Sequence, residues 1–97
     1  MPYALTAKWT AKAGEEERVL AALERLIPAT LAEPGCLVYR ASRSVEDPHV
    51  FLLYEEYVDE DAFAAHGASE HFQRLAAGEA IPLLESRERA FYRTLDD

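Results

Sequence analysis

The residues best suited to chemistry in this chain lie between positions 51 and 72. A strand-like segment carries Tyr54, Glu55 and Tyr57, and an acid-capped helical segment that ends in His66 follows it directly. Phenol hydroxyls, a carboxylate and an imidazole beside apolar side chains are what a small pocket needs to move protons on an aromatic ligand. The pattern therefore predicts acid–base chemistry, provided that the fold brings these groups together.

His66 is the first candidate for a catalytic role. It lies at helical spacing from Ala62 and Phe63, so its ring points toward the interior or its edge. An imidazole titrates near neutral pH, which suits a general base. A buried structural histidine with satisfied hydrogen bonds explains the same position, and both interpretations stay open.

Glu55 is the second catalytic candidate. It shares a strand face with Phe51, where an unpaired carboxylate is costly to bury. We favour an ion pair with a neighbouring arginine, Arg40 or Arg89, or a contact across a dimer. The alternative is that Glu55 orients His66 or contacts a ligand directly.

A metal centre is not expected from the remaining reactive residues. His71 follows Ser69 at a helix start and is expected to be exposed, and its five-residue offset places it about 140° from His66 on a continuous helix. Metal-binding histidine pairs favour spacings of three or four. Cys36 is the single cysteine, so no intrachain disulfide forms, and we interpret it as a structural thiol. We therefore predict neither a metal nor a cofactor.

The composition indicates one small domain over residues 1–97. A formal net charge of −8 argues against nucleic acid and anionic membranes as partners. Charged residues interrupt every apolar run before it reaches membrane-spanning length, and the first ten residues lack the pattern of an export signal. A cytoplasmic location is the default expectation.

Alternating polarity predicts four strands. They span residues 3–12, 36–46, 49–58 and 86–95, and the Asp47-Pro48 turn joins the middle two as a hairpin. The arginines of the last strand are interpreted as balancing the acid excess rather than binding phosphate; they are Arg87, Arg89 and Arg93.

Two helical regions separate the strands. Three glutamates at 15–17 favour a helix start, and Pro28 predicts a kink or an early end. Asp59 is a good N-cap for the second region, which Gly67 is expected to interrupt before Ser69 caps a new turn. Gly78 and Pro82 are expected to bracket a loop or irregular turn.

The order β-α-β-β-α-β predicts a ferredoxin-like α+β fold: a four-stranded antiparallel sheet with both helices on one face. The third strand is apolar on both faces, so we expect a homodimer that covers the second face. A pocket would lie between the helices and the sheet. Its candidate lining residues are Trp9, Tyr39, Phe51, Tyr54, Glu55, Tyr57, Phe63, His66, His71 and Phe72.

Several segments together resemble the antibiotic biosynthesis monooxygenase (ABM) superfamily of dimeric α+β-barrel proteins. The resemblance rests on the Glu-Pro-Gly-Cys turn at residues 33–36, the hairpin turn at 46–48, and the spaced residues from 55 to 72. These last are Glu55, Tyr57, Asp59, Ala62, His66, Ser69, His71 and Phe72. The resemblance implies a ferredoxin-like fold, a homodimer and one pocket per subunit.

The resemblance also implies an activity: cofactor-independent oxidation of a hydroquinone or polyphenol by dioxygen. His66 would be the base, Glu55 its orienting partner, and Trp9, Tyr54 and Tyr57 hydrogen-bond donors or stacking groups. The haem-degrading branch of the superfamily is disfavoured, because the first strand offers no Asn and His66 occupies the Trp position. The competing hypothesis is a non-catalytic, stress-related dimer that binds an aromatic ligand.

Overall fold

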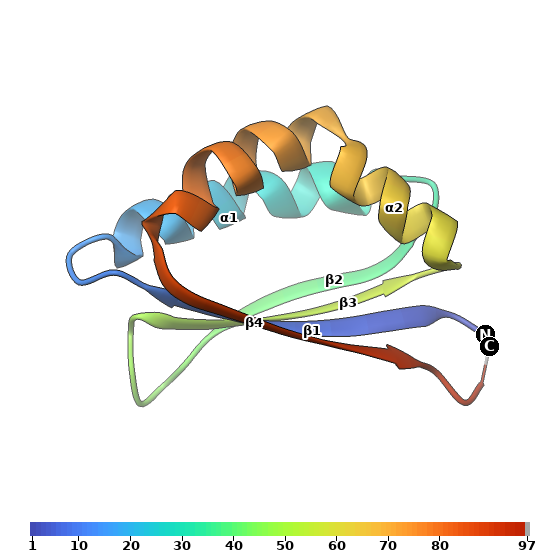
Figure 1. The fold of residues 1–97 in the computed structure, drawn as a ribbon, viewed down its shortest axis with the longest axis horizontal. Coiled ribbons are helices and arrows are strands. Elements are labelled where there is room, and N and C mark those ends of the chain that lie inside the picture. Colours follow the sequence, from blue (N-terminus) through green and yellow to red (C-terminus); the bar gives the residue numbers. More distant parts are fainter. Residues whose placement is uncertain (97) are drawn as a thin grey trace.

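The computed structural model describes residues 1–96 as a four-stranded antiparallel sheet with its helices on one face (Figure 1). Strand order is β2-β3-β1-β4. The elements are β1 (Tyr3–Ala11), α1 (Glu16–Leu31), β2 (Cys36–Arg43), β3 (Val50–Tyr57), α2 (Glu60–Ala68), the π-helix η1 (Phe72–Ala80), the 3₁₀-helix η2 (Ile81–Leu83) and β4 (Leu84–Arg93). The ferredoxin-like arrangement predicted from the sequence is confirmed.

The two central strands place their alternate side chains as predicted. In β1, Leu5, Ala7 and Trp9 are buried, while the intervening Lys8 is exposed. In β3, the face that includes Glu55 is buried and the intervening residues are exposed or half-buried. Because strand side chains alternate between faces, every site residue on these strands is assigned to one side of the sheet.

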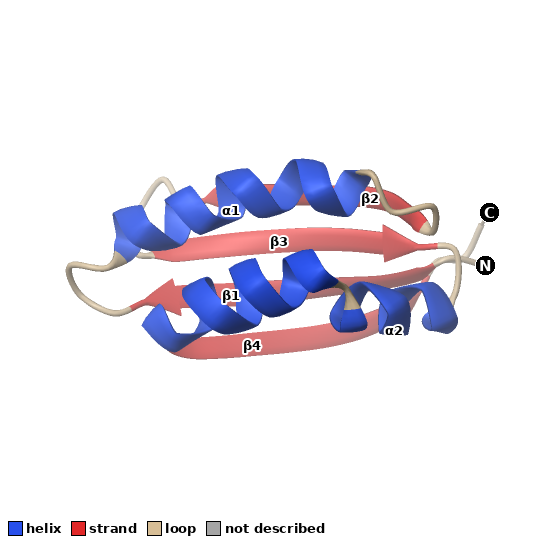
Figure 2. Ribbon diagram, turned by 90° about the horizontal axis from the view of Figure 1, so that it is seen from above, coloured by secondary structure: helices blue, strands red, loops and turns tan. Residues whose placement is uncertain are grey.

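The helices divide the covered face between them. Figure 2 shows α1 above β2 and β3, and α2 with η1 above β1 and β4. The buried stripe of α1, which includes Val19, Leu23 and Leu26, joins the core with Leu53 of β3. The site region lies beneath α2 and η1, and residues of β2 and β3 also reach it.

Pro28 lies inside α1 and does not end it. The predicted early end at this residue is wrong, because the helix continues to Leu31. Proline removes one bond, to the Glu24 carbonyl, but its own carbonyl accepts the N–H of Ala32 at 3.2 Å. Pro28 therefore removes one backbone hydrogen bond of α1, and the helix continues beyond it.

The second helical region begins as predicted and ends later. The Oδ1 atom of Asp59 accepts the N–H of Ala62 at 2.8 Å, which confirms the N-cap. Gly67 does not interrupt the helix as expected, because α2 runs through it with no positive φ. The Oγ atom of Ser69 then accepts the N–H of Phe72 at 3.2 Å, so it does cap the following turn.

The loop predicted between Gly78 and Pro82 is helical. Gly78 lies within η1, and Pro82 lies in the first turn of η2. A proline in a first turn loses no helical hydrogen bond, and a glycine is tolerated in a helix at a modest cost. The loop prediction is therefore wrong.

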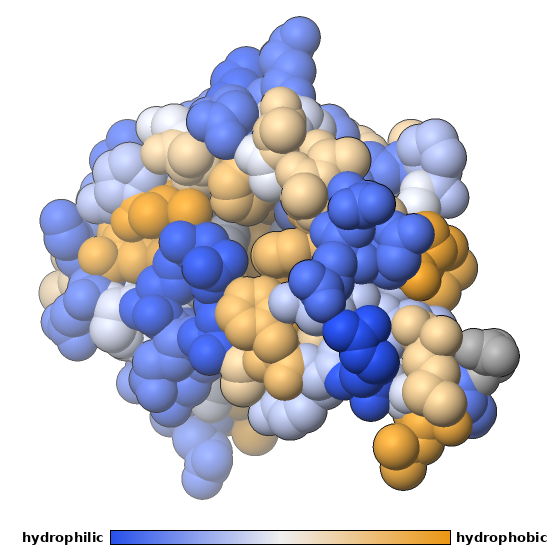
Figure 3. Space-filling model, turned by 45° about the vertical axis from the view of Figure 1, so that its right-hand side comes forward, coloured by the Kyte–Doolittle hydropathy of each residue, from blue (hydrophilic) through white to orange (hydrophobic). Residues whose placement is uncertain are grey.

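The second face of the sheet carries no helix. Leu52, Tyr54 and Tyr92 are exposed there. An oblique view from the side of the chain ends shows apolar residues in separate patches among hydrophilic ones (Figure 3). Within residues 1–96, no helix has the length and hydropathy needed to cross a membrane.

Candidate active site

A cavity of about 440 Å³ lies between the sheet and the layer formed by α2 and η1. Small side chains face one another across it: Ala7 on β1, Ala64 and Gly67 on α2, and Ala77 on η1. Because these side chains are small, they leave the cavity unfilled. The volume falls within the range of about 300–1,000 Å³ that is typical of small-ligand pockets.

Trp9 lies in the floor of this cavity. It is 3% exposed, and among residues 1–96 its buried Nε1–H has no hydrogen-bond partner. A buried donor without a partner costs free energy that a bound acceptor would recover. The Nε1–H of Trp9 therefore remains a donor that needs an acceptor.

Glu55 lines the cavity from β3 and is 5% exposed. Its Oε1 atom accepts the hydroxyl hydrogen of Tyr57 at 2.7 Å. Burial raises the pKa of Glu55 to about 7, although the Tyr57 bond and the positive charges of Arg89 and Arg87 oppose the shift. The carboxyl group can therefore hold or release a proton near neutral pH.

His66 reaches the cavity from α2 and is 2% exposed. Its Nδ1 atom lies 2.8 Å from Oε2 of Glu33, and its Nε2 atom lies 3.9 Å from Oε1 of Glu55. Burial lowers the pKa of His66, while the Glu33 carboxylate acts in the opposite direction. The imidazole thus lies between two carboxyl groups, one of which lines the cavity.

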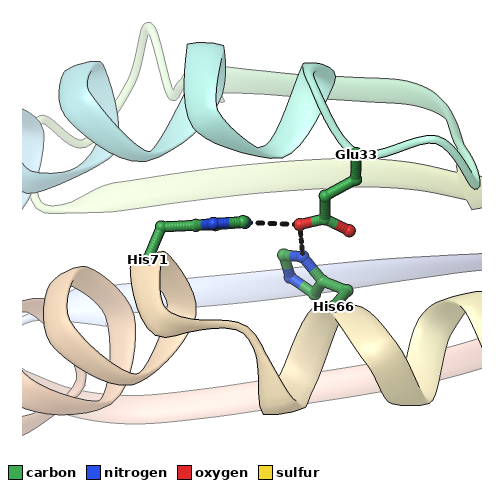
Figure 4. A group of neighbouring side chains, drawn as sticks. All are labelled: Glu33, His66 and His71. Carbon is green, nitrogen blue, oxygen red and sulfur yellow. Dashed lines mark hydrogen bonds and ion pairs between the residues drawn. The ribbon is translucent and has the colours of Figure 1, made fainter.

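His71 contacts the same glutamate oxygen as His66 (Figure 4). Its Nε2 atom lies 2.5 Å from Oε2 of Glu33. The sequence argument that kept the two histidines on different faces of one helix is wrong, because α2 ends at Ala68 and the chain redirects before η1.

This cluster forms a path from the interior toward the surface. The exposed fraction of the side chain rises from 3% in His66 to 13% in Glu33 and 20% in His71. Each neighbouring pair is joined by one hydrogen bond or ion pair. A proton taken up in the cavity therefore has a hydrogen-bonded route outward.

The same three residues are candidate metal ligands. They offer two imidazole nitrogens and a carboxylate oxygen within 4.8 Å of one another, a set that suits zinc. These atoms already bond one another, so a metal ion would have to displace the shared protons.

The structure brings most of the predicted site residues together. Those that line the cavity are Trp9, Tyr39, Glu55, Phe63, His66 and Phe72. Tyr57 lies behind Glu55 as its hydrogen-bond donor, and Phe51 belongs to the apolar core. Tyr54 lies on the opposite sheet face, where its hydroxyl donates to Glu56 at 2.7 Å. His71 contacts Glu33 rather than lining the cavity.

Sequence reasoning missed three charged residues of the site. Arg87 and Arg89 line the cavity, although they were interpreted as balancing charge and Arg89 also as a possible ion-pair partner of Glu55. Their alternation along the last strand could have indicated that both side chains lie on one sheet face, since this strand pairs with β1 in the structure. Glu33 was noted only as part of the turn at residues 33–36, so its contact with the histidines was not predicted.

Cys36 is not a strong nucleophile in this setting. Burial and the negative charges of Glu33 and Glu55 raise the pKa of its thiol to about 11. The thiol also donates to the carbonyl of Val38 at 3.6 Å. These features agree with a structural role.

Comparison with known families decides the relationship. The family model described as antibiotic biosynthesis monooxygenase matches residues 2–78. The chain belongs to the ABM family. Membership supports a monooxygenase-type role at the level of the family.

Solved structures show the same fold. Protein PA3566 from Pseudomonas aeruginosa is 33% identical, with a TM-score of 0.89 and coverage of 98% of this chain and 95% of that chain. Protein SO0527 from Shewanella oneidensis is also 33% identical, with a TM-score of 0.86 and coverage of 94% and 88%. Rv0793 from Mycobacterium tuberculosis is 26% identical, with a TM-score of 0.89 and coverage of 100% and 98%. No curated protein matches the sequence.

Proposed function

We propose that this ABM-family protein is a cofactor-independent monooxygenase that oxidises a hydroquinone or polyphenol with dioxygen. The observation that carries the proposal is the position of His66. Its imidazole lines a cavity of ligand size, with one nitrogen bonded to Glu33 and the other facing Glu55. A buried base with a carboxylate behind it is what deprotonation of a phenol requires.

The first step is proton transfer from a substrate hydroxyl. With Nδ1 of His66 donating to Glu33, its Nε2 atom is free to accept the proton. The Glu33 carboxylate then stabilises the imidazolium, and His71 beyond it leads toward solvent. Burial keeps the imidazole neutral, and therefore basic, before substrate enters.

The substrate anion supplies the electrons for the remaining steps. One electron passes to dioxygen, which gives superoxide and a semiquinone radical, and their recombination forms a carbon–oxygen bond. The resulting hydroperoxide loses water and leaves a hydroxylated quinone. One oxygen atom enters the product and the other leaves as water, so the substrate is the only reductant.

Aromatic walls around His66 favour this chemistry. Phe63 and Phe72 pack against His66, with ring centroids 6.4 and 5.1 Å away. Tyr39 also lines the cavity, and burial raises its pKa, so it stays a hydroxyl donor. In a dry site, fixed donors stabilise a developing anion more strongly than they would in water.

A homodimer and a cytoplasmic location are part of the same proposal. The helix-free sheet face exposes Leu52, Tyr54 and Tyr92, which a second copy would cover. Light scattering coupled to gel filtration tests the dimer. A mass near twice that of the chain is expected, and Leu52→Glu is expected to lower it toward one chain.

Oxygen-electrode assays with a panel of quinols test the activity. The native protein is expected to consume oxygen with at least one quinol, and His66→Ala is expected to lose most of that rate. His49→Ala is the matched control, because His49 contacts Glu16 and Asp47 away from the main cavity. No uptake by the native chain, or equal uptake by His66→Ala, would contradict the proposal.

A non-catalytic aromatic-binding protein is the second candidate, and the unpartnered Nε1–H of Trp9 favours it. That donor provides a binding contact whether or not chemistry follows. Ligand binding without oxygen uptake would support this candidate. A Soret band on haem titration would instead point to the branch that the sequence disfavours.

A further inference from the structure

Two arginines at the cavity make no direct contact with a carboxylate within residues 1–96, although their charges act on Glu55. Arg87 and Arg89 line the cavity from β4, and neither side chain has a hydrogen bond or an ion pair within residues 1–96. The guanidinium of Arg89 instead lies 5.3 Å from the ring centroid of Phe91. In an acidic chain, unpaired arginines beside a cavity are unexpected.

The other arginines show how unusual this is. Five of them form ion pairs with glutamates: Arg18, Arg25, Arg43, Arg74 and Arg93. Arg40 is the remaining one, and it lies on the opposite sheet face, in register with Tyr54. Acidic partners are abundant, because the chain has 18 acidic residues against 10 basic ones. The unpaired cations at the cavity are thus not explained by a shortage of carboxylates.

An unpaired neutral donor lies beside these two cations. Trp9 is opposite Arg87 in the β1–β4 register, and its neighbour on the same face, Ala7, is opposite Arg89. The Nε1–H of Trp9 is buried without a partner. Two guanidinium groups and one N–H donor therefore surround the same part of the cavity floor and lack acceptors.

The opposite end of the cavity holds the acid–base groups. Glu55 is opposite Leu5 in the β1–β3 register, two residues along β1 from Ala7. Two residues of a strand span about 7 Å, which is comparable to the long dimension of a monocyclic aromatic acid. The cavity is therefore polarised. The cations lie opposite Ala7 and Trp9, whereas Glu55 lies opposite Leu5 and 3.9 Å from Nε2 of His66.

We propose that Arg87, Arg89 and Trp9 form a subsite for the carboxylate of a monocyclic dihydroxy aromatic acid. Guanidinium groups bind carboxylates through charge-assisted hydrogen bonds, and the indole N–H adds a third donor. The ring then lies between Phe63 and the floor, and a hydroxyl points toward His66. The substrate class rests on the proposed function, whereas the anion subsite does not.

Glu55 is the one carboxyl group among the residues that line the cavity, and it would repel an anion placed beside it. The register places Glu55 opposite Leu5 and Arg87 opposite Trp9, four residues along β1, although the charges of Arg87 and Arg89 still act on Glu55. Its hydrogen bond from Tyr57 disperses part of its charge. The carboxylate of the ligand is accordingly oriented toward the arginines and away from Glu55.

Anaerobic calorimetry with a matched ligand pair tests the subsite. The probes are 2,5-dihydroxybenzoate and the neutral 2,5-dihydroxybenzamide, which have the same shape and differ in charge. The native protein is expected to bind the acid roughly tenfold more tightly than the amide, as expected for one charge-assisted contact. Arg87→Gln and Arg89→Gln are each expected to weaken acid binding by about tenfold and to leave amide binding unchanged.

Arg40→Gln is the matched control. It removes the same charge from the opposite sheet face, so both affinities are expected to stay at native values. Trp9→Phe keeps an aromatic ring but removes the N–H, and it is expected to weaken acid binding a few-fold. Circular dichroism melting curves establish that each variant is folded.

Three outcomes would overturn the subsite: equal native affinity for acid and amide, no binding of either probe, or the same loss in Arg40→Gln as in Arg87→Gln. The proposed function fails separately. Selective acid binding without oxygen uptake would remove the monooxygenase and keep the subsite. Oxygen uptake with neutral hydroquinone, together with equal binding of the acid and the amide, would remove the subsite and keep the monooxygenase.

Discussion

Nδ1 of His66 lies 2.8 Å from Oε2 of Glu33, although the two residues are 33 positions apart in the chain. Glu33 belongs to the turn that follows α1, whereas His66 lies in α2. Figure 4 shows both side chains converging from these separate elements. This contact joins the cavity to the outer histidine, His71, and defines the candidate base.

Glu33→Gln is expected to weaken that base. The Glu33 carboxylate raises the pKa of His66 against the effect of burial, so its neutralisation should lower that pKa further. Nitrogen-15 NMR titration of the His66 ring measures the change directly, and the rate of oxygen uptake should fall by about tenfold. Glu56→Gln is the control, because Glu56 bonds Tyr54 on the other sheet face. An unchanged His66 titration would contradict the assigned role of Glu33.

Glu55 is expected to make folding stability fall as pH rises. Its pKa is about 7 in the folded protein, above the ordinary value of 4.5, so the folded state binds more protons between these limits. Stability relative to Glu55→Gln should therefore be greatest below pH 4.5 and decline toward pH 7. The decline should amount to about 3 kcal/mol at most.

Urea unfolding of native protein and Glu55→Gln across this pH range measures the decline. The difference in unfolding free energy between the two proteins reports the titration of Glu55, because the titration of His66 contributes to both. A difference that is constant with pH, or that grows in favour of the native protein, would rule out a raised pKa at Glu55.

Gly35 is expected to resist substitution for a steric reason. A Cβ atom at this position would lie 2.5 Å from the Cβ atom of Ala62 in α2. Gly35→Ala should therefore displace α2 and destabilise the protein by about 1–3 kcal/mol. Gly67→Ala is the matched control, since nothing lies within 4 Å of its added Cβ. That change should stabilise α2 by up to about 1 kcal/mol. Equal melting temperatures for the two variants would contradict the close approach.

Added Zn²⁺ is expected to inhibit oxygen uptake, because it would take Nδ1 of His66 and the Glu33 oxygen that supports the base nitrogen Nε2. The ligand atoms of Glu33, His66 and His71 lie within 4.8 Å of one another, so they can converge on one ion. Treatment with a chelator should leave native activity unchanged. His71→Asn should reduce inhibition by Zn²⁺, whereas His49→Asn should retain it. Loss of activity on chelation would mean that the reaction needs a metal.

Local sequence signals predicted the fold and half of the site. Alternation in the third strand placed Glu55 on one face with Phe51, and the structure shows that the helices cover this face. The Asp59 and Ser69 caps placed the helix that carries His66. Both signals depend on neighbours in the chain, so a sequence contains them.

Contacts between distant elements were not predictable in this way. The Glu33–His66 bond depends on how the turn after α1 packs against α2, and the cavity position of Arg87 depends on the β1–β4 register. The separation of the two histidines was also predicted wrongly. A continuous helix would separate them, but the chain redirects after Ala68 and brings His71 to Glu33.

Isotope labelling of the product tests the central claim most directly. Native protein should be given a dihydroxy aromatic substrate under ¹⁸O₂ in ordinary water, and the product analysed by mass spectrometry. The account predicts one ¹⁸O atom in each product molecule, formed by native protein and His49→Ala but not by His66→Ala. Product that contains no ¹⁸O, or labelled product formed equally well by His66→Ala, would contradict it.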